Sequence, residues 1–354
     1  MSQIRVVFFL AVVSFALGGV TAALLDKRIV LVKREETASI LHVNLSHRDN
    51  ELHLGEQDKV NKLSGVSCDN YKRRPIAVMI TEDKEARPLS GIGLADLVIE
   101  MPVVTNSITR MMAIFVCAEP KEIGSVRSAR HDFIALAKGY DAIFAYWGGS
   151  HFALDELGKK VIDNLDALPN YFDVFFRKNW IPAPHNGFTS MRRMVYAAQN
   201  LGYRLDSNFA GYKFNENQNG DFAPKTLTIS YIYPYNVKYE YNHTTNLYYR
   251  WRGGEEEIDK ITEVQVSARN IVIMRAKSRQ VEGDYNDVDI IGSGDAVIHR
   301  NGDEVKGRWA KKDYSDILRF YDKNDREVEF APGSIWIEVV EPETAVNYEL
   351  GIIN

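Results

Sequence analysis

The segment IGSVRSARHDF, residues 123–133, places two arginines where a helix is expected to begin. Arg127 and Arg130 carry guanidinium groups, which bind phosphate or carboxylate through two parallel hydrogen bonds. The N-terminal end of a helix also presents free backbone N–H groups and the positive end of the helix dipole. Because this end repels cations, the two arginines need a negative partner. The segment therefore predicts either a site for an external anion or an internal brace.

Three further side chains can complete an anion site at this place. Ser128 is expected to cap the helix, and Ser125 and His131 add hydrogen-bonding capacity. Arg110 begins the preceding strand, so it reaches the site only if that end of the strand lies near the helix start. In the brace alternative, the arginines pair with carboxylates of the fold, and the candidates are Glu100, Asp132 and Asp155.

A second group of candidates lies in turns. In the loop APHN, His185 is placed by turn geometry and can act as a general acid or base, with Asn186 beside it. Asp155 is the alternative acid or base. The strand that ends in WGGS is followed by His151, at a position where α/β sheets often form crevices.

Several familiar motifs are missing from the sequence. It contains no C-x-x-C pair, H-E-x-x-H, Walker-type loop, G-x-S-x-G elbow or G-x-G-x-x-G fingerprint. We therefore predict no metal and no cofactor.

The elements that must position these residues divide the chain in two. From Pro75 onward, PIAVMI, ADLVIEM and ITRMMAIF have the apolar character of buried strands and alternate with helical segments, which is typical of an α/β layered domain. From about Pro224 short alternating runs and turn residues predict a β-rich domain. The predicted fold class is α+β, with an N-terminal α/β domain at 71–205 and a smaller, mostly β domain at 224–345.

The N-terminus has the physical character of a membrane segment. Residues 6–25 carry no charge and match the roughly 20 residues that span a bilayer. Residues 1–25 are predicted as an uncleaved anchor or a secretory signal, and the polar residues 26–70 as a stalk. More Lys and Arg residues follow the segment than precede it, which by the charge rule alone places the following domains in the cytoplasm.

Charge and cysteine content limit the function further. The net charge of -5 argues against nucleic-acid binding by bulk phosphate neutralisation. The two cysteines, Cys68 and Cys117, form either one disulfide or two buried free thiols, and the sequence does not decide between them.

The motifs RPIAVMI, ARPLSGIGLADLVIE, ITRMMAIF, IGSVRSAR, YDAIFAYWGGS and APHN, together with the later APGSIWIEVV, resemble the YerB-like bacterial family called domain of unknown function 3048. The resemblance covers about residues 74–342. It implies two domains, exported and held at the outer face of the cytoplasmic membrane, and no established reaction. On this ground we expect the domains to be extracytoplasmic, against the charge rule.

Two departures from the family pattern are visible. The family usually has Asp-Asn after AVMI, where this chain has Thr81-Glu82-Asp83, and acidic Glu-Gly-Gly before ITR, where it has Val104-Thr105-Asn106-Ser107. If those acidic residues were catalytic, activity in this chain would be lost. The chain also lacks the Cys after the apolar segment that a lipoprotein would use.

A weaker similarity is to the LytR/CpsA/Psr cell-wall phosphotransferases, which clamp a pyrophosphate with arginines. The leading hypothesis is a membrane-anchored binding or accessory factor of the cell envelope, whose partner is an anionic envelope ligand or an envelope protein. The alternatives are a cell-wall phosphotransferase or hydrolase that uses Arg110, Arg127 and Arg130 as its anion clamp, and a purely structural interaction protein.

Overall fold

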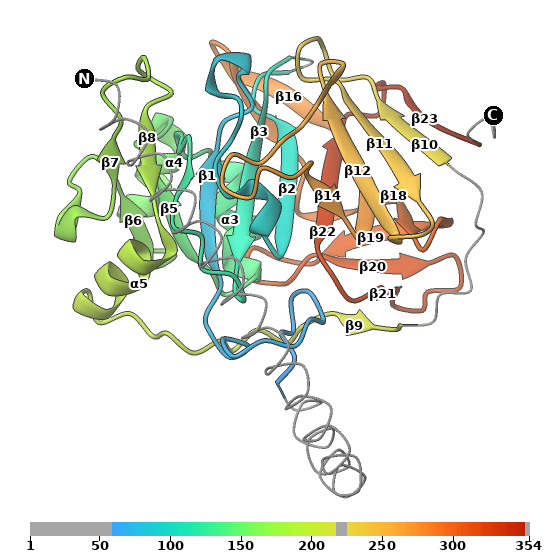
Figure 1. Ribbon diagram of the computed structural model, residues 1–354, viewed down its shortest axis with the longest axis horizontal. Coiled ribbons are helices and arrows are strands. Elements are labelled where there is room, and N and C mark those ends of the chain that lie inside the picture. Colours follow the sequence, from blue (N-terminus) through green and yellow to red (C-terminus); the bar gives the residue numbers. More distant parts are fainter. Residues whose placement is uncertain (1–58, 106, 217–224, 351–354) are drawn as a thin grey trace, which may run out of the picture. The chain divides into compact units, whose positions relative to one another are not determined.

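The computed structural model describes residues 59–105, 107–216 and 225–350. These residues belong to one compact unit, Lys59–Asn354 (Figure 1). The predicted membrane segment lies outside the described residues. Among those that are described, no helix has the length and apolar character needed to cross a membrane.

A ten-stranded sheet forms the centre of this unit. It takes strands from both predicted domains, because β2 pairs in parallel with β22, with Leu97 opposite Ile335 and Glu100 opposite Glu338. In spatial order its strands are β20 (Arg319–Asp322), β19 (Asp303–Lys311), β18 (Gly292–Arg300), β15 (Asn270–Arg275), β22 (Ile335–Val340), β2 (Leu97–Pro102), β3 (Thr109–Phe115), β1 (Ile76–Ile80), β5 (Ile143–Tyr146) and β6 (Asn164–Asp166).

The central strands are buried on both faces, as their continuous apolar runs predict. In β1, Ala77 and Met79 belong to one hydrophobic core, and Ile76, Val78 and Ile80 belong to the other. Successive side chains of a strand point to opposite faces, so one apolar run serves two cores.

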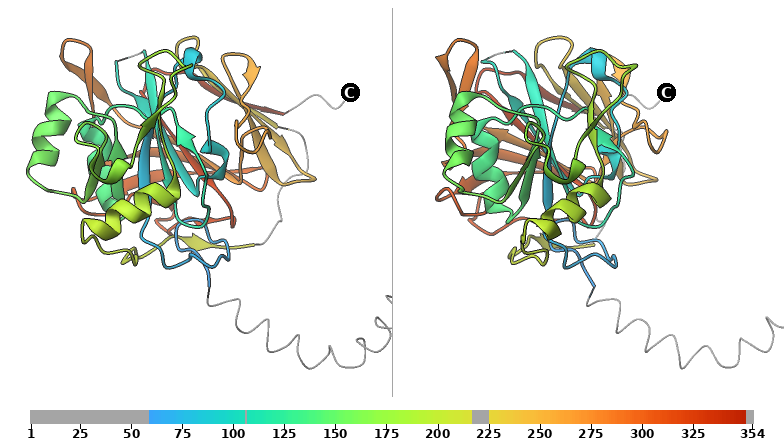
Figure 2. Two further views of the ribbon diagram at one scale, coloured as in Figure 1. Left: turned by 60° about the vertical axis from the view of Figure 1, so that its left-hand side comes forward. Right: turned by 90° about the vertical axis from the view of Figure 1, so that its left-hand side faces the viewer.

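Helices cover part of each face. The first core contains residues of α3 (His131–Gly139) and α4 (His151–Gly158), and the second contains residues of α5 (Met191–Asn200). Figure 2 shows α3 and α4, in green, side by side along one flank of the sheet. Three short 3-10 helices lie in loops: η1 (Lys84–Ala86), η2 (Ile92–Leu94) and η3 (Tyr171–Asp173).

A six-stranded sheet packs on the second core and belongs wholly to the C-terminal half. Buried residues alternate with more exposed ones along three of its strands, Lys225–Ile229, Val237–Asn242 and Leu247–Arg252, so one face meets the core. The strands are β13 (Glu255–Glu256), β12 (Leu247–Arg252), β11 (Val237–Asn242), β10 (Lys225–Ile229) and β23 (Val346–Leu350), with β14 (Ser267–Ala268) beside β12.

The remaining strands form three small sheets. These are β4 (Ile123–Gly124), β8 (Gly187–Thr189) and β7 (Phe176–Arg177); the hairpin of β16 (Ser278–Glu282) and β17 (Tyr285–Val288); and the pair of β9 (Lys213–Phe214) and β21 (Glu329–Phe330). The described chain is therefore sheet-rich throughout, and the regular helix–strand alternation predicted for the N-terminal half is limited to the region of α3 and α4.

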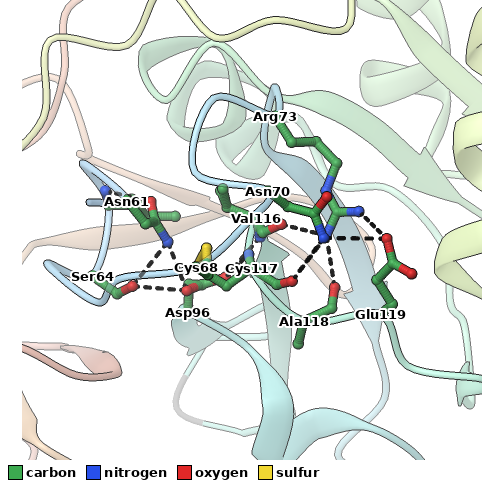
Figure 3. The surroundings of a disulfide bond; sticks show 11 residues. Asn61, Ser64, Cys68, Asn70, Arg73, Asp96, Val116, Cys117, Ala118 and Glu119 are labelled. Carbon is green, nitrogen blue, oxygen red and sulfur yellow. Dashed lines mark hydrogen bonds and ion pairs between the residues drawn. A yellow bond between two sulfur atoms is a disulfide. The ribbon is translucent and has the colours of Figure 1, made fainter. Parts of the chain in front are cut away.

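A disulfide between Cys68 and Cys117 ties the first described residues to the end of β3 (Figure 3). Asp96 supports this junction, since one of its carboxylate oxygens accepts hydrogen bonds from Asn61 and Ser64 and the other accepts from the backbone of residues 116 and 117. Residues 59–70, which the sequence assigned to the stalk, therefore pack as part of the compact unit.

Candidate functional site

Three arginines meet where β1 ends. Because β3 runs antiparallel to β1, with Met111 opposite Ile80, the start of β3 lies beside the end of β1 and brings Arg110 there. The chain that follows β4 crosses the same place, since the backbone N–H of Arg127 donates to the carbonyl of Met79. Antiparallel pairing therefore brings the start of β3 to this site, which is the condition set above for Arg110 to take part in it. We call Arg110, Arg127 and Arg130 the arginine cluster.

Arg127 has a carboxylate partner that the sequence analysis did not name. Its Nη1 donates to Oδ2 of Asp83 at 3.0 Å and lies 3.2 Å from Nδ1 of His185. Because a guanidinium can only donate, Nδ1 of His185 must accept, and in the neutral ring the proton is then on Nε2. The predicted acid or base His185 therefore does join the cluster.

Among the described residues, Asp83 is the one carboxylate that forms an ion pair with the arginine cluster. Thr81 donates to its Oδ2 at 2.7 Å, and the hydroxyl of Tyr235 donates to its Oδ1 at 2.9 Å. Burial opposes ionisation of this carboxyl, but the hydrogen bond from Thr81 and the charge of Arg127 outweigh burial, so its pKa is below the usual value. Asp83 is thus a stable anion.

Arg110 is buried, with 4% of its surface exposed, yet it has no carboxylate partner within the described chain. Its Nη1 donates to the carbonyl of Ser128 at 3.2 Å, and its Nε has no partner among the residues that the structure describes. Burial, followed by repulsion from Arg130 and Arg127, lowers the pKa of the Arg110 guanidinium to about 9. The cation therefore lies in an environment that disfavours its charge.

Arg130 is similarly short of partners. Its Nη1 donates to the carbonyl of Ala129 at 3.0 Å, and its Nε is buried without a partner. The guanidinium carbon lies 5.3 Å from the ring centre of Tyr285, at a distance that permits a cation–π contact. Burial lowers the pKa of Arg130 as well.

The expected brace partners of the arginines are wrong. Glu100 lies on β2 and pairs with two other arginines. Asp132 lies within ion-pair distance of His131 and favours the charge of Arg130 only from a greater distance. Asp155 is exposed on α4, with no ion pair within the described chain. Asp155 is also not brought to the arginine cluster, which leaves His185 as the acid or base candidate there.

The predicted cap of α3 is also wrong. The helix begins at His131, and its N-cap is Arg130, which makes no capping hydrogen bond through its side chain. Ser128 contributes only a carbonyl to Arg110. The Oγ of Ser125 is buried without a partner beside this region.

Two further candidates pair elsewhere. Asn186 accepts a hydrogen bond from Arg177 at 2.7 Å. His151 lies 3.2 Å from the carboxylate of Glu282, on the hairpin of β16 and β17. Neither contact involves the arginine cluster.

A different set of arginines is saturated with carboxylates. Arg250 and Arg252, on β12, are fully buried and meet four buried glutamates from distant parts of the chain. We call these six residues the buried arginine–glutamate network, and its glutamates are Glu82, Glu100, Glu257 and Glu338.

Short contacts hold this network together. Nη1 of Arg250 lies 2.5 Å from Glu338, and Arg252 lies 2.9 Å from Glu82 and 2.5 Å from Glu100. Burial, followed by repulsion from Glu100, raises the pKa of Glu338 to about 7. Two arginines cannot fully neutralise four carboxylates, so this carboxyl retains its proton more readily than usual.

The sequence analysis missed this network because its members are far apart in the chain. One signal was present: Arg250 and Arg252 are two positions apart in the strand LYYRWR and so share one face of it. The glutamates gave no comparable signal, since Glu82, Glu100 and Glu338 lie within or beside three different apolar runs and Glu257 lies in the polar segment GGEEEIDK.

The motif resemblance is confirmed by two family matches. Residues 63–204 match the family described as "Protein of unknown function (DUF3048) N-terminal domain", and residues 227–337 match the corresponding C-terminal domain. The chain belongs to this family. The arginine cluster and His185 all fall within the N-terminal match.

A curated relative and a solved structure agree with the assignment. The chain is 30% identical over 288 residues to "Putative lipoprotein YerB" of Bacillus subtilis (strain 168), which covers 79% of this chain and 85% of that protein. It is also similar to the crystal structure of the YerB protein from Bacillus subtilis, with a TM-score of 0.74 and 27% identity over 81% of this chain and 99% of that one.

Proposed function

We propose that this protein is a membrane-anchored accessory factor of the cell envelope that binds an anionic envelope ligand at the arginine cluster. One observation carries the proposal: Arg110 is a buried guanidinium without a carboxylate partner in the described chain, and two more arginines lie close enough to repel it. Within the described chain, Asp83 alone forms an ion pair with these three arginines, so their positive charge is not fully neutralised. A phosphate or carboxylate group would complete it.

Buried hydrogen-bond donors near the cluster also support a bound anion. Nε of Arg110, Nε of Arg130 and Oγ of Ser125 are all buried without partners in the described structure. Buried polar groups are normally hydrogen-bonded, and a bound anion is one way to satisfy several donors together. The positive charge that an anion would neutralise is confined to this cluster, which agrees with the negative net charge of the whole chain.

The proposed location rests on separate observations. The relative named above is described as a lipoprotein, which is a membrane-anchored class of protein. The disulfide between Cys68 and Cys117 suits an oxidising compartment outside the cytoplasm. The apolar segment at residues 6–25 is the proposed anchor of this chain.

The binding proposal can be tested by thermal unfolding of the full chain in detergent. Inorganic phosphate, pyrophosphate and citrate serve as probes, and we compare the wild type with Arg110→Gln, Arg127→Gln and Arg130→Gln. We expect at least one probe to raise the unfolding temperature of the wild type and each variant to need about tenfold more of it, because a lost charge-assisted hydrogen bond contributes on the order of 1.5 kcal/mol or more.

Arg308→Gln is the matched control, since Arg308 forms an exposed pair with Asp325 on β19, away from the cluster. This control should respond to the probe as the wild type does. If no probe shifts the wild type, or if all arginine variants including Arg308→Gln respond alike, the cluster is only a brace and the protein a structural one.

A catalytic role has one observation in its favour. Nδ1 of His185 lies 3.8 Å from Asp83 and beside Arg127, which is an arrangement suited to proton transfer at a bound anion. Incubation with pyrophosphate esters and detection of released phosphate tests this alternative. Turnover that His185→Asn abolishes would replace the binding role with an enzymatic one.

A further inference from the structure

We propose that His131, Asp132 and Asp287 form a binding site for a divalent metal ion of the zinc class. The three ligand atoms are Nε2 of His131 and one carboxylate oxygen from each aspartate, and all lie within 4.8 Å of one another. No metal was predicted from the sequence, because the familiar metal-binding motifs are missing from it, and Asp287 is far from the other two residues in the chain. This site does not depend on the proposed anion-binding function.

The distances from His131 to the two aspartates match the separation of two ligands around a tetrahedral ion. Nε2 of His131 lies 3.4 Å from Oδ1 of Asp132 and 3.2 Å from Oδ1 of Asp287. Ligands at about 2.0 to 2.2 Å from a tetrahedral zinc ion are about 3.3 to 3.6 Å apart. An ion can therefore bind between these atoms with only small movements of the side chains.

The backbone holds the ligands in two packed elements. His131 and Asp132 occupy the first turn of α3, and Asp287 lies on β17 of the adjacent hairpin. The two elements are joined directly, since the backbone N–H of Val288 donates to Oδ1 of Asp132 at 3.3 Å. The imidazole of His131 also packs near the ring of Phe152, with 5.6 Å between the ring centres.

Burial is graded across the three side chains. Asp132 is 6% exposed, whereas His131 and Asp287 are 21% and 23% exposed. Three protein ligands with one side open to solvent leave a fourth position for water or an exchangeable ligand, as in zinc sites that are not purely structural.

The surrounding charges leave the ligand set negative. Arg279 pairs with Oδ2 of Asp287, which leaves Oδ1 facing His131. Arg279 also meets Asp289 at 3.5 Å, and the Glu156 carboxylate lies near enough to act on Asp132. Arg130 contributes the opposing positive charge from its position over Tyr285. Two carboxylates and one imidazole thus offer ligand atoms to a divalent ion despite the two nearby arginines.

Ligand chemistry favours the zinc class over magnesium. Imidazole is a preferred ligand of Zn²⁺ and related transition ions, whereas Mg²⁺ prefers six oxygen ligands in octahedral geometry. A bound ion would join α3, from the segment matching the N-terminal family domain, to the hairpin from the segment matching the C-terminal one.

Calorimetric titration of the EDTA-treated full chain with ZnCl₂ in phosphate-free buffer tests the proposal. We expect one equivalent of Zn²⁺ to bind, and MgCl₂ to bind at least about tenfold more weakly. Asp287→Asn should weaken zinc binding about tenfold or more, because it removes a charged carboxylate ligand. His131→Asn should do the same, and Co²⁺ should give a visible absorption spectrum of tetrahedral intensity only when the ligands are intact.

Two variants serve as matched controls. Asp289→Asn removes a carboxylate from the same part of the hairpin, and His151→Asn removes a nearby imidazole that pairs with Glu282. Both should bind zinc as the wild type does. Binding that is absent in the wild type, or that is equal in Asp287→Asn and Asp289→Asn, would overturn the proposal. Circular dichroism of each variant separates loss of the site from loss of folding, and Arg110→Gln should retain zinc binding even if it loses anion binding.

Discussion

The two groups of arginines in this protein meet opposite electrostatic conditions. In the buried arginine–glutamate network, two arginines face four glutamates, whereas in the described part of the arginine cluster a single ion pair joins Arg127 to Asp83. Burial alone does not separate them, because Arg110 and Arg250 are both buried. The difference lies in the carboxylates that each guanidinium meets.

This contrast distinguishes a brace from a candidate site. A buried ion pair is costly to break because removal of one partner leaves an uncompensated charge. A buried arginine without a carboxylate partner already carries such an uncompensated charge in the folded state. We therefore infer that the buried arginine–glutamate network is structural and that the arginine cluster binds an anionic ligand.

The two groups are neighbours and share a short segment. After β1, Glu82 enters the network through Arg252, and the next residue, Asp83, enters the cluster through Arg127. Tyr235 also joins both, since its carbonyl accepts from Arg252 at 3.0 Å and its hydroxyl donates to Asp83 at 2.9 Å. A substitution in one group can therefore affect the side chains of the other group through these shared contacts.

The largest effect is expected for Arg250→Met in the network. The substitution leaves Glu338 and its neighbouring carboxylates without their closest cation, so the free energy of unfolding should fall by roughly 3–5 kcal/mol. Urea denaturation of the purified chain measures the loss, with Arg250→Lys as the variant to use if the methionine variant does not fold. A loss below about 1 kcal/mol would mean that the network is not a brace.

A smaller change in the free energy of unfolding is expected when the pH is raised. The pKa of Glu338 is raised to about 7 in the folded state, so its stabilising contribution is complete below its ordinary pKa and is lost as the pH rises through 7. Between about pH 4.5 and pH 7 the wild type should lose on the order of 2–3 kcal/mol from this group. Denaturant midpoints measured across this range should change less in Glu338→Gln.

In the arginine cluster, the contribution of Asp83 to stability depends on pH in the opposite direction. Its pKa is lowered in the folded state, so its contribution is present above its ordinary pKa and is lost as the pH falls through the lowered value. Asp83→Asn should therefore reduce the stability change in the acid range and leave the change near neutral pH intact. Identical pH profiles for Glu338→Gln and Asp83→Asn would contradict the contrast between the two groups.

The smallest effect is expected for Arg110→Met in buffer without multivalent anions. The substitution removes a buried cation that lacks a carboxylate partner and is repelled by two arginines, so the free energy of unfolding should stay within about 1 kcal/mol of the wild type or rise. Urea denaturation beside Arg250→Met gives the comparison. A loss as large as that of Arg250→Met would show that Arg110 is part of a brace.

Several features of the fold were predictable from local sequence. The runs PIAVMI, ADLVIEM and ITRMMAIF predicted strands, and they form β1, β2 and β3 at the centre of the sheet. The β-rich character after residue 224 is confirmed as well. These properties depend on apolar periodicity and turn residues, which are local in the chain.

The sheet order was not predictable in the same way. Nothing in Leu97–Pro102 indicates that β2 pairs with β22, which lies more than half the chain further on, rather than only with its neighbour β3. A buried strand presents the same apolar pattern whichever strand pairs with it. The predicted domain boundaries remain a prediction, while the central sheet takes strands from both segments.

The amino-acid sequence alone indicates that Arg127 and Arg130 lie where α3 begins, that His185 lies in a turn and that the chain belongs to its family. The charge contacts become visible in the folded chain: Asp83 with Arg127, Arg110 with no carboxylate of the described chain, and His131 with Asp287. Strand and turn preferences are encoded over a few residues, whereas a charge contact depends on sheet order and strand register. The arginine cluster was therefore visible in the sequence, but its missing negative charge was not.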